Sequence, residues 1–364
     1  MNRIIISVTN DFATDQRLLR TCDCFNELGY DILLIGRKLK NSFEINLPYK
    51  THRFRLLFNK GFLFYAEYNL RLFIKLLFTR KDLLYANDLD TLLPNYLMSK
   101  ITSCALIYDS HEYFTEVPEL ISRPKIRSFW IKLENSIFPR LKNVITVNQK
   151  LADIYSSKYK VPVTVIKNVP RSAVEKVFDP VVALSEDQKM VLYQGSLNMG
   201  RGLELMIDAM MHLENHLLVL AGGGDILDQL QVRVLENHLE DKVIFLGKLL
   251  PEQLQGVTNQ ADIGLSLEED LGLNYRYCLP NKVFDYIQAQ IPVLVSDLPL
   301  LKELVSTYAI GECLTQRNPE SLAFSIKNII RHKNDYRDGL ISASGQLNWE
   351  NEKKVFTEFI NQID

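Results

Sequence analysis

The stretch Val191-Leu-Tyr-Gln-Gly195-Ser-Leu-Asn-Met-Gly200-Arg201-Gly202-Leu203 indicates how this chain folds. It starts as a short apolar run, which is typical of a buried strand, and continues into a glycine-rich turn. From Leu203 onward, apolar residues recur with the period of an amphipathic helix. A helix that begins at such a turn directs its free amides toward it, which suits a phosphate group, and Arg201 adds a permanent cation. On spacing alone, a tight turn with a solvated arginine explains the stretch equally well.

Short apolar runs alternate with helical segments along the rest of the chain. Strands are expected at 4–9, 31–35, 83–86, 104–108, 144–147 and 163–166, and again at 190–194, 217–221, 243–246, 263–267 and 293–295. This alternation predicts an α/β protein with two doubly wound, Rossmann-like parallel sheets. Because the periodicity is interrupted between Val169 and Gln188, we predict domains at 1–170 and 171–348. Residues 349–364 include a further helical segment.

The composition of the 364 residues is that of a globular protein, with 47% hydrophobic and 24% charged residues. The net charge is −2, but residues 1–175 carry +9 and residues 176–364 carry −11. A basic first half is compatible with nucleic acid, an anionic membrane surface or an anionic substrate, and charge alone does not choose among them.

Cysteine usage and hydropathy indicate a cytoplasmic protein. The five cysteines have no paired C-x-x-C spacing, so neither a zinc site nor a disulfide framework is expected. The first apolar run, Ile4–Val8, is too short for a signal peptide. The longer run Gly61–Phe78 contains Glu67, Arg71 and Lys75, which are costly to bury in a bilayer, so we do not expect it to span a membrane.

Two further motifs follow in the second half. Val219-Leu-Ala-Gly222-Gly223-Gly224-Asp225 ends a strand in a second glycine turn, although any tight strand-to-helix turn can use glycines. The stretch Asn274 to Tyr286 contains Leu279-Pro280-Asn281-Lys282-Val-Phe-Asp285-Tyr286, in which a helix begins and carries a carboxylate one turn in. Such a carboxylate can accept two hydroxyl hydrogen bonds, while Lys282 and the preceding amides face an anion.

In this order, the motifs resemble the donor site of family 4 (group 1) glycosyltransferases with the GT-B fold, in the subtype that carries Pro-Asn-Lys-x-Phe-Glu-Tyr. The resemblance implies two Rossmann-like domains facing a central cleft, with the helix at 349–364 packed back on the first. The second domain would bind a nucleotide-sugar donor. Its implied binding residues are Gly195, Ser196, Arg201, Gly222, Gly223, Gly224, Leu279, Pro280, Asn281 and Lys282 for the donor diphosphate and nucleotide, and Asp285 for the ribose.

The chain departs from the family pattern at several positions. Ser196 stands where an arginine is usual, and Asp285 stands where a glutamate is usual. Tyr277 occupies the place of the first acid of the family's carboxylate pair, which contacts the donor sugar. Glu268 and Glu269 follow the expected strand 263–267, but acids at such a place are usually solvated loop charges, so we do not expect either to replace that acid.

The first half offers polar residues at the ends of its expected strands. Val8 to Arg17 closes the first strand and opens a helix that Thr14 or Asp15 would cap. By the resemblance, this loop meets the acceptor and the donor phosphates. The candidate contacts there are Asn10, Asp11 and Arg17.

Two acidic clusters follow later strands. Asn87-Asp88-Leu89-Asp90 looks like a D-x-D metal motif, but that motif belongs to a fold with a single nucleotide domain. We therefore interpret Asp88 as a binding residue at the sheet edge and Asp90 as a helix cap, and we expect no metal. Asp109-Ser-His111-Glu112 resembles the family's Asp-x-His-Glu segment, which implies that His111 contacts the transferred sugar and that Asp109 or Glu112 orients it.

The resemblance implies a retaining, metal-independent glycosyltransferase without a cofactor, in which His111, Arg201, Lys282 and Asp285 act on the donor. The acceptor would be a saccharide or lipid-linked molecule of bacterial surface polysaccharide or glycolipid biosynthesis, and no nucleic acid is expected as a partner. Two alternatives remain open: a sugar-nucleotide epimerase of the same fold, and a catalytically lapsed homologue that acts as a complex partner.

The segment Arg53–Lys81 mixes aromatic and basic residues over an expected helix. Its basic residues are Arg53, Arg55, Lys60, Arg71, Lys75, Arg80 and Lys81. An amphipathic face of this kind could rest on the inner face of the membrane as a peripheral contact. A buried crossover helix with solvated charges explains the same pattern, because every crossover helix needs an apolar stripe.

Overall fold

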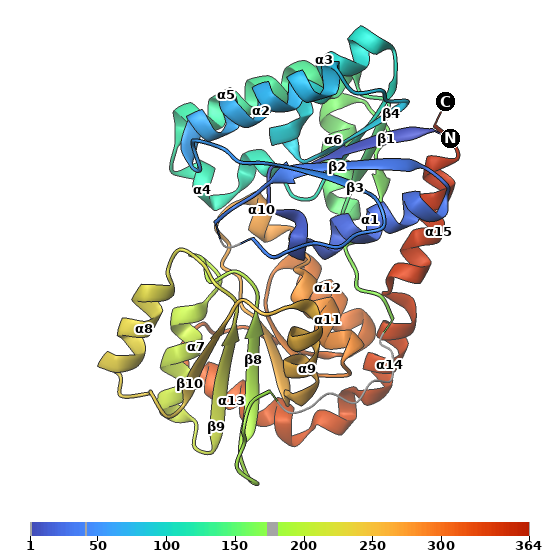
Figure 1. Ribbon diagram of the computed structural model, residues 1–364. Coiled ribbons are helices and arrows are strands. Elements are labelled where there is room, and N and C mark those ends of the chain that lie inside the picture. Colours follow the sequence, from blue (N-terminus) through green and yellow to red (C-terminus); the bar gives the residue numbers. More distant parts are fainter. Residues whose placement is uncertain (1, 41, 173–180, 364) are drawn as a thin grey trace. The chain divides into compact units, whose positions relative to one another are not determined.

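The computed structural model describes residues 2–40, 42–172 and 181–363 (Figure 1). The chain forms two compact units. The first comprises the residues up to Asn168 together with those from Glu352 onward, and the second runs from Val169 to Asn351. Each unit is built on one parallel sheet with helices on its faces (Figure 1). The predicted α/β architecture with two parallel sheets is therefore confirmed.

The first sheet has seven strands in the order β3-β2-β1-β4-β5-β6-β7. Their bounds are β1 Arg3–Ser7, β2 Asp31–Arg37, β3 Lys50–Phe54, β4 Leu83–Asn87, β5 Ala105–Ser110, β6 Asn143–Thr146 and β7 Thr164–Val165. The helices of this unit are α1 Gln16–Glu27, α2 Gly61–Leu77, α3 Leu89–Thr102, α4 Pro118–Ile121, α5 Pro124–Ile137 and α6 Gln149–Tyr159. Ile4, Ile5 and Ile6 of β1 are completely buried, because helices cover both faces of the strand.

The second sheet has six strands in the order β10-β9-β8-β11-β12-β13. Their bounds are β8 Lys189–Gln194, β9 His216–Ala221, β10 Val243–Gly247, β11 Ile263–Ser266, β12 Val293–Ser296 and β13 Gly311–Leu314. The helices are α7 Leu203–Ala209, α8 Leu227–Glu236, α9 Pro251–Gln260, α10 Leu273–Arg276, α11 Asn281–Gln288, α12 Pro299–Tyr308, α13 Pro319–Arg331 and α14 Arg337–Gln346. Val191 and Tyr193 of β8 lie in one hydrophobic core and Met190 and Leu192 in another, so this sheet is also buried on both faces.

Two strands were not predicted from the sequence, β3 and β13. Both are edge strands that pair on one side only. β3 reads Lys-Thr-His-Arg-Phe and is buried only at Phe54, so it lacks the apolar run that marks a central strand. The helix expected over Arg53–Lys81 is corrected accordingly, because α2 begins only at Gly61.

The helix α15, Trp349–Ile360, leaves the second unit and ends in the first. Its Phe356 ring lies 5.5 Å from the ring of Phe25 on α1 in an edge contact. The amide of Lys167 donates a 2.8 Å hydrogen bond to the Glu352 carboxylate. These contacts tie the end of the chain to the first unit.

Candidate functional site

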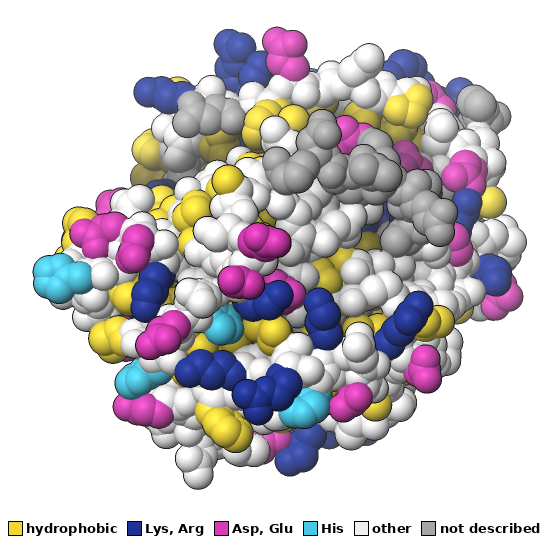
Figure 2. All heavy atoms as spheres, turned by 90° about the horizontal axis from the view of Figure 1, so that it is seen from below, with side chains coloured by type: hydrophobic (Ala, Val, Ile, Leu, Met, Phe, Trp, Pro, Cys, Tyr) yellow, Lys and Arg dark blue, Asp and Glu magenta, His cyan; other side chains and the backbone are white. Residues whose placement is uncertain are grey.

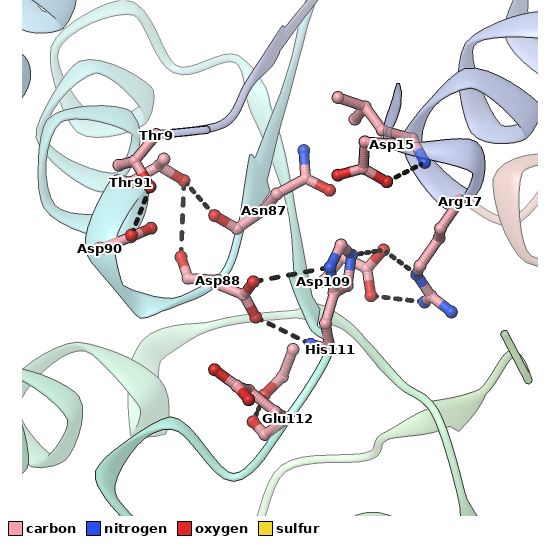
Figure 3. Close-up of polar contacts among 12 residues, drawn as sticks. Thr9, Asp15, Arg17, Asn87, Asp88, Asp90, Thr91, Asp109, His111 and Glu112 are labelled. Carbon is pink, nitrogen blue, oxygen red and sulfur yellow. Dashed lines mark hydrogen bonds and ion pairs between the residues drawn. The ribbon is translucent and has the colours of Figure 1, made fainter. Parts of the chain in front are cut away.

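Polar residues gather where β1, β4 and β5 of the first unit end. The three strands are neighbours in the sheet, and their register pairs Ser7 with Ala86 and Asn87 with Asp109. The residues that follow therefore share one edge of the sheet (Figure 3). In α/β sheets this carboxyl edge is where ligands bind.

His111 lies between two carboxylates at this edge (Figure 3). Its Nε2 is 2.9 Å from Asp109 Oδ2, and its Nδ1 is 3.5 Å from Asp88 Oδ2. Burial favours the neutral ring, but the carboxylates of Asp109 and Asp88 outweigh it and raise the pKa of His111 to about 9. The imidazole is therefore a cation at neutral pH, and 19% of its side chain is exposed.

Asp109 is the centre of this cluster. Its buried carboxylate accepts two hydrogen bonds from Arg17, at 2.7 and 3.2 Å, and one from Tyr85 Oη at 2.7 Å. Burial raises the pKa of Asp109, but Arg17 and His111 together hold it well below the ordinary value. Arg17 is itself buried and also donates to the Ile166 carbonyl, so its guanidinium is committed to holding this edge together.

Asp88 has an unusual backbone conformation, with φ 57° and ψ 170°. Non-glycine residues rarely adopt it, and such strain is typical of functional sites. Two hydrogen bonds hold it in place: the Asp88 amide donates to the Asp109 carbonyl at 2.8 Å, and the His111 amide donates to Asp88 Oδ1 at 2.9 Å. Asp88 is thereby fixed beside the imidazole.

Asp90 is not the helix cap that the sequence predicts. Asp88 occupies the N-cap position of α3, and the buried Asp90 carboxyl forms a 2.5 Å hydrogen bond with Thr9 Oγ1 (Figure 3). Burial, reinforced by the charge of Asp88, raises the pKa of Asp90 to about 8. Its side chain thus links the end of β1 to α3 in the interior.

The other residues predicted in this unit lie in different settings. Asn10 is exposed, and its carbonyl accepts from the Arg37 amide. Asp11 caps a short 3-10 helix and forms an ion pair with Arg53 at 3.3 Å. Asp15 caps α1, as predicted, through the Leu18 amide. The Glu112 carbonyl accepts from Ser110 Oγ, directly after His111.

In the second unit, Lys282 and Arg201 share one carboxylate. Glu268 Oε1 lies 2.8 Å from Lys282 Nζ and 3.3 Å from Arg201 Nη1, and its other oxygen accepts from Ser266. Lys282 Nζ also lies 4.1 Å from the centre of the Tyr193 ring. Two cations around one carboxylate leave the cluster with a net charge of +1.

Glu268 is completely buried, which contradicts the prediction of a solvated loop charge. Burial raises the pKa of Glu268, but Lys282 and Arg201 reverse this and lower it to about 2, so the side chain is an anion. The signal in the sequence was indirect: a lysine in the first turn of a buried helix needs a counter-charge, and Glu268 is an acid close to it in the chain.

Arg201 is only partly buried, and its contact with Glu268 does not use all of its donors. A quarter of its side chain is exposed, and its Nε is buried without a hydrogen-bond partner among the described residues. The guanidinium carbon lies 4.7 Å from the centre of the Tyr275 ring, which fixes its direction. A buried donor without a partner is unfavourable until an acceptor reaches it.

Asp285 on α11 is positioned by a residue that the sequence interpretation missed. Gln194, the last residue of β8, donates to Asp285 Oδ2 at 2.8 Å and accepts from Thr258 Oγ1 at 2.7 Å. Its side chain is buried, so it connects α9 to α11 through the end of the strand. The local signal in the sequence is that Gln194, a polar residue, ends the apolar run of β8 directly before Gly195.

The two glycine turns pack against each other. A Cβ on Gly222 would lie 1.8 Å from the Gly195 carbonyl oxygen, and one on Gly224 would lie 2.2 Å from the Leu197 carbonyl oxygen. The glycines are therefore needed for this contact between turns. Ser196 and Gly223 lie in the same pair of turns, and Leu279, Pro280 and Asn281 lead into α11 beside Lys282.

No group of three or more His, Cys, Asp or Glu side chains is arranged to hold a metal ion within the described residues. Over the same part of the chain, no helix combines the length and the apolar character needed to cross a bilayer.

Solved structures of other proteins share this architecture over the whole chain. Sucrose-phosphate synthase from Thermosynechococcus elongatus superposes with a TM-score of 0.79 at 17% identity, covering 100% of this chain and 99% of the other. WaaG, a glycosyltransferase involved in lipopolysaccharide biosynthesis, gives 0.73 at 12% identity, with both chains covered completely. Anabaena Alr3699/HepE in complex with UDP and glucose gives 0.72 at 16% identity, covering 99% and 100%. The fold is GT-B.

The sequence itself matches a family over its second half. Residues 174–344 match the family described as glycosyl transferases group 1. An uncharacterized glycosyltransferase of Methanocaldococcus jannaschii, MJ1607, is 28% identical over an alignment of 204 residues. The match covers 51% of this chain and 50% of that relative, so the chain spans about half of the relative's length. The segment that resembles this family therefore lies within the second unit.

Proposed function

We propose that the chain is a retaining glycosyltransferase, of the Pro-Asn-Lys-x-Phe-Glu-Tyr subtype, that transfers a sugar from a nucleotide-sugar donor. The observation that carries the proposal is the cluster of Lys282, Arg201 and Glu268 at the glycine turns. A buried carboxylate there holds two cations with one positive charge in excess. Within the described part of the chain, no acceptor reaches the Nε of Arg201. A diphosphate supplies both the negative charge and the acceptor oxygens.

The second unit would hold the donor by its nucleotide. Lys282 and Arg201 would bind the diphosphate oxygens, and the amides that begin α11 would add further donors. Asp285, oriented by Gln194, would accept hydrogen bonds from the ribose hydroxyls, with a water completing the reach of the shorter side chain. Structures of Anabaena HepE contain UDP and UDP-glucose, which favours a uridine nucleotide as the first donor to test.

In the transfer step, the bond between the sugar C1 and the diphosphate oxygen breaks while the acceptor oxygen bonds to C1 on the same face. The acceptor proton passes to the departing diphosphate, so no separate protein base is required. Lys282 and Arg201 would stabilise the negative charge that develops on the leaving group. We assign Glu268 a positioning role. Its carboxylate is completely buried and contacts the two cations, so it would act on a ligand only through them.

The first unit would contribute His111 to the transferred sugar. Its Nδ1 has the longer of the two carboxylate contacts, so this nitrogen is the one that a sugar hydroxyl can engage. Arg17, Asp109 and Asp88 would act as positioning residues that keep the ring charged and oriented. The acceptor would be a saccharide or a lipid-linked saccharide of bacterial surface polysaccharide or glycolipid synthesis, and the lipid-linked case would bring the protein to the inner face of the membrane.

Incubation with a panel of nucleotide sugars, beginning with UDP-glucose, tests the proposal. With alkyl glycosides as acceptors, we expect nucleoside diphosphate release that depends on the acceptor, and a product with the anomeric configuration of the donor. The Lys282→Met variant is the matched control and should lose this release. An interconverted sugar nucleotide would instead identify an epimerase. Nucleotide binding without turnover would identify a lapsed homologue, which the sequence favours at one position, because Tyr277 stands where the family has an acid.

A further inference from the structure

Helix α2 carries two apolar stripes on different sides. One stripe is buried in the core of the first unit and consists of Phe64, Tyr68, Leu72 and Leu76. The other, which we call the outer stripe, is 45% to 81% exposed and consists of Phe62, Leu63, Leu70, Ile74 and Leu77, together with Phe78 at the C-cap of the helix. The residues of the buried stripe are spaced four apart, which suffices to pack a crossover helix. The outer stripe therefore needs a separate explanation.

The outer stripe continues onto the neighbouring helix. The Phe62 ring lies 6.3 Å from the ring of Phe129 on α5, which is 47% exposed, and Ile126 on the same helix is 44% exposed. Leu57, in the loop before α2, is 79% exposed. On the face drawn in Figure 2, by contrast, hydrophobic side chains are scattered among acidic and basic ones. Continuous exposed apolar surface of this kind marks an interaction site.

The segment that carries the outer stripe is basic. Residues 53–81 contain seven basic residues and one acidic residue, Glu67. The Glu67 carboxylate accepts from the amides of Leu57 and Phe58 and pairs with Arg71 at 2.7 Å, so it is already neutralised within the protein. Lys60 and Arg80 flank the two ends of the stripe and are exposed. A partner that matches this surface would offer an apolar interior to the exposed side chains of the stripe and an anionic surface to the basic residues.

We propose that the outer stripe of α2, with Phe129 and Ile126 of α5, docks on an anionic lipid bilayer. The helix would lie in the plane of the interface, with the apolar side chains among the acyl chains and the basic residues among the headgroups. A single convex helix offers no pocket for the anchoring side chains of a protein partner, whereas a bilayer adapts to it. The proposal rests on the first unit alone and is independent of the reaction proposed above.

Vesicle flotation of the full chain tests this proposal. With vesicles of phosphatidylcholine and phosphatidylglycerol at low salt, we expect the protein to float, and we expect at least tenfold weaker binding to phosphatidylcholine alone. The Phe62→Ser/Leu70→Ser/Ile74→Ser variant should lose at least tenfold in partitioning. The matched control is Phe324→Ser on α13, because Phe324 is 72% exposed on the other unit and should leave flotation unchanged.

Three outcomes would overturn the proposal. One is that the wild-type chain fails to float with anionic vesicles at low salt. Another is that the triple variant and the Phe324→Ser control float equally well. A third is that sedimentation shows the wild type as a dimer that the triple variant breaks, which would make the outer stripe a contact between copies. The single variant Leu70→Ser repeats the comparison if the triple variant does not fold.

Discussion

Replacing Glu268 by glutamine should destabilise the second unit, because the side chain keeps its shape but loses its charge. With an effective dielectric constant near 20, the attraction of Glu268 is about 6 kcal/mol for Lys282 at 2.8 Å and about 5 kcal/mol for Arg201 at 3.3 Å. Desolvation of the three charges offsets much of this in the native protein. The loss expected when one partner of a buried pair is removed is about 3–5 kcal/mol.

The two tryptophans allow this loss to be measured in one unit. Trp130 lies in the first unit and Trp349 in the second, so in a Trp130→Phe background the fluorescence reports on the second unit. A loss of 3–5 kcal/mol lowers the urea midpoint by about 1.5–2.5 M for a slope near 2 kcal/mol/M. Glu269→Gln is the matched control: Glu269 is 42% exposed and 4.0 Å from Arg317, so its loss should change stability by at most about 0.5 kcal/mol.

The binding role that we propose for the cluster gives a second readout. In Glu268→Gln the two cations lack their counter-charge, and added UDP supplies one. UDP should therefore stabilise Glu268→Gln more than the wild type, and the double variant Glu268→Gln/Lys282→Met should regain part of the lost stability. Equal urea midpoints for Glu268→Gln and Glu269→Gln would refute the reasoning about the buried charge. A loss of stability without any effect of UDP would leave the charge argument intact and contradict the assignment of a diphosphate site.

Three further predictions concern His111, Lys282 and Asp90. His111→Ala should lower kcat/KM while leaving the affinity for UDP nearly unchanged, and a collapse of UDP affinity in calorimetry would contradict its assignment to the sugar. Lys282→Met should weaken UDP binding by about 1.5–3 kcal/mol, and a chelator should leave wild-type activity unchanged; abolition by the chelator would point to a metal. Asp90 has its pKa raised from 3.8 to about 8, so its contribution to stability is full below pH 4 and is lost as the pH rises to 8. Asp90→Asn should remove that part of the pH dependence, so its stability relative to the wild type should rise between pH 5 and pH 8 in urea unfolding followed by Trp130.

The sequence predicts the two sheets because their central strands are covered on both faces and so read as unbroken apolar runs. The edge strand β3 has no such apolar run and is not predicted, because Phe54 is its only buried residue. The cations Lys282 and Arg201 are recognisable from their motifs. Their shared counter-ion has only an indirect signal: Glu268 is 14 residues from Lys282 in the chain but 67 from Arg201, so the three side chains meet only in the folded unit. Gln194 and Asp285 are 91 residues apart and escape for the same reason.

The two units solve the same electrostatic problem. A cationic side chain cannot be held in the interior without a counter-charge. In the first unit the buried Asp109 holds Arg17 and His111, and in the second the buried Glu268 holds Arg201 and Lys282. Each carboxylate lies at or just after the end of a parallel strand, where the backbone positions it rigidly. A strand-end acid that sequence reasoning assigns to a solvated loop should therefore be examined as a counter-ion whenever a motif places a lysine or arginine in a buried helix beside it.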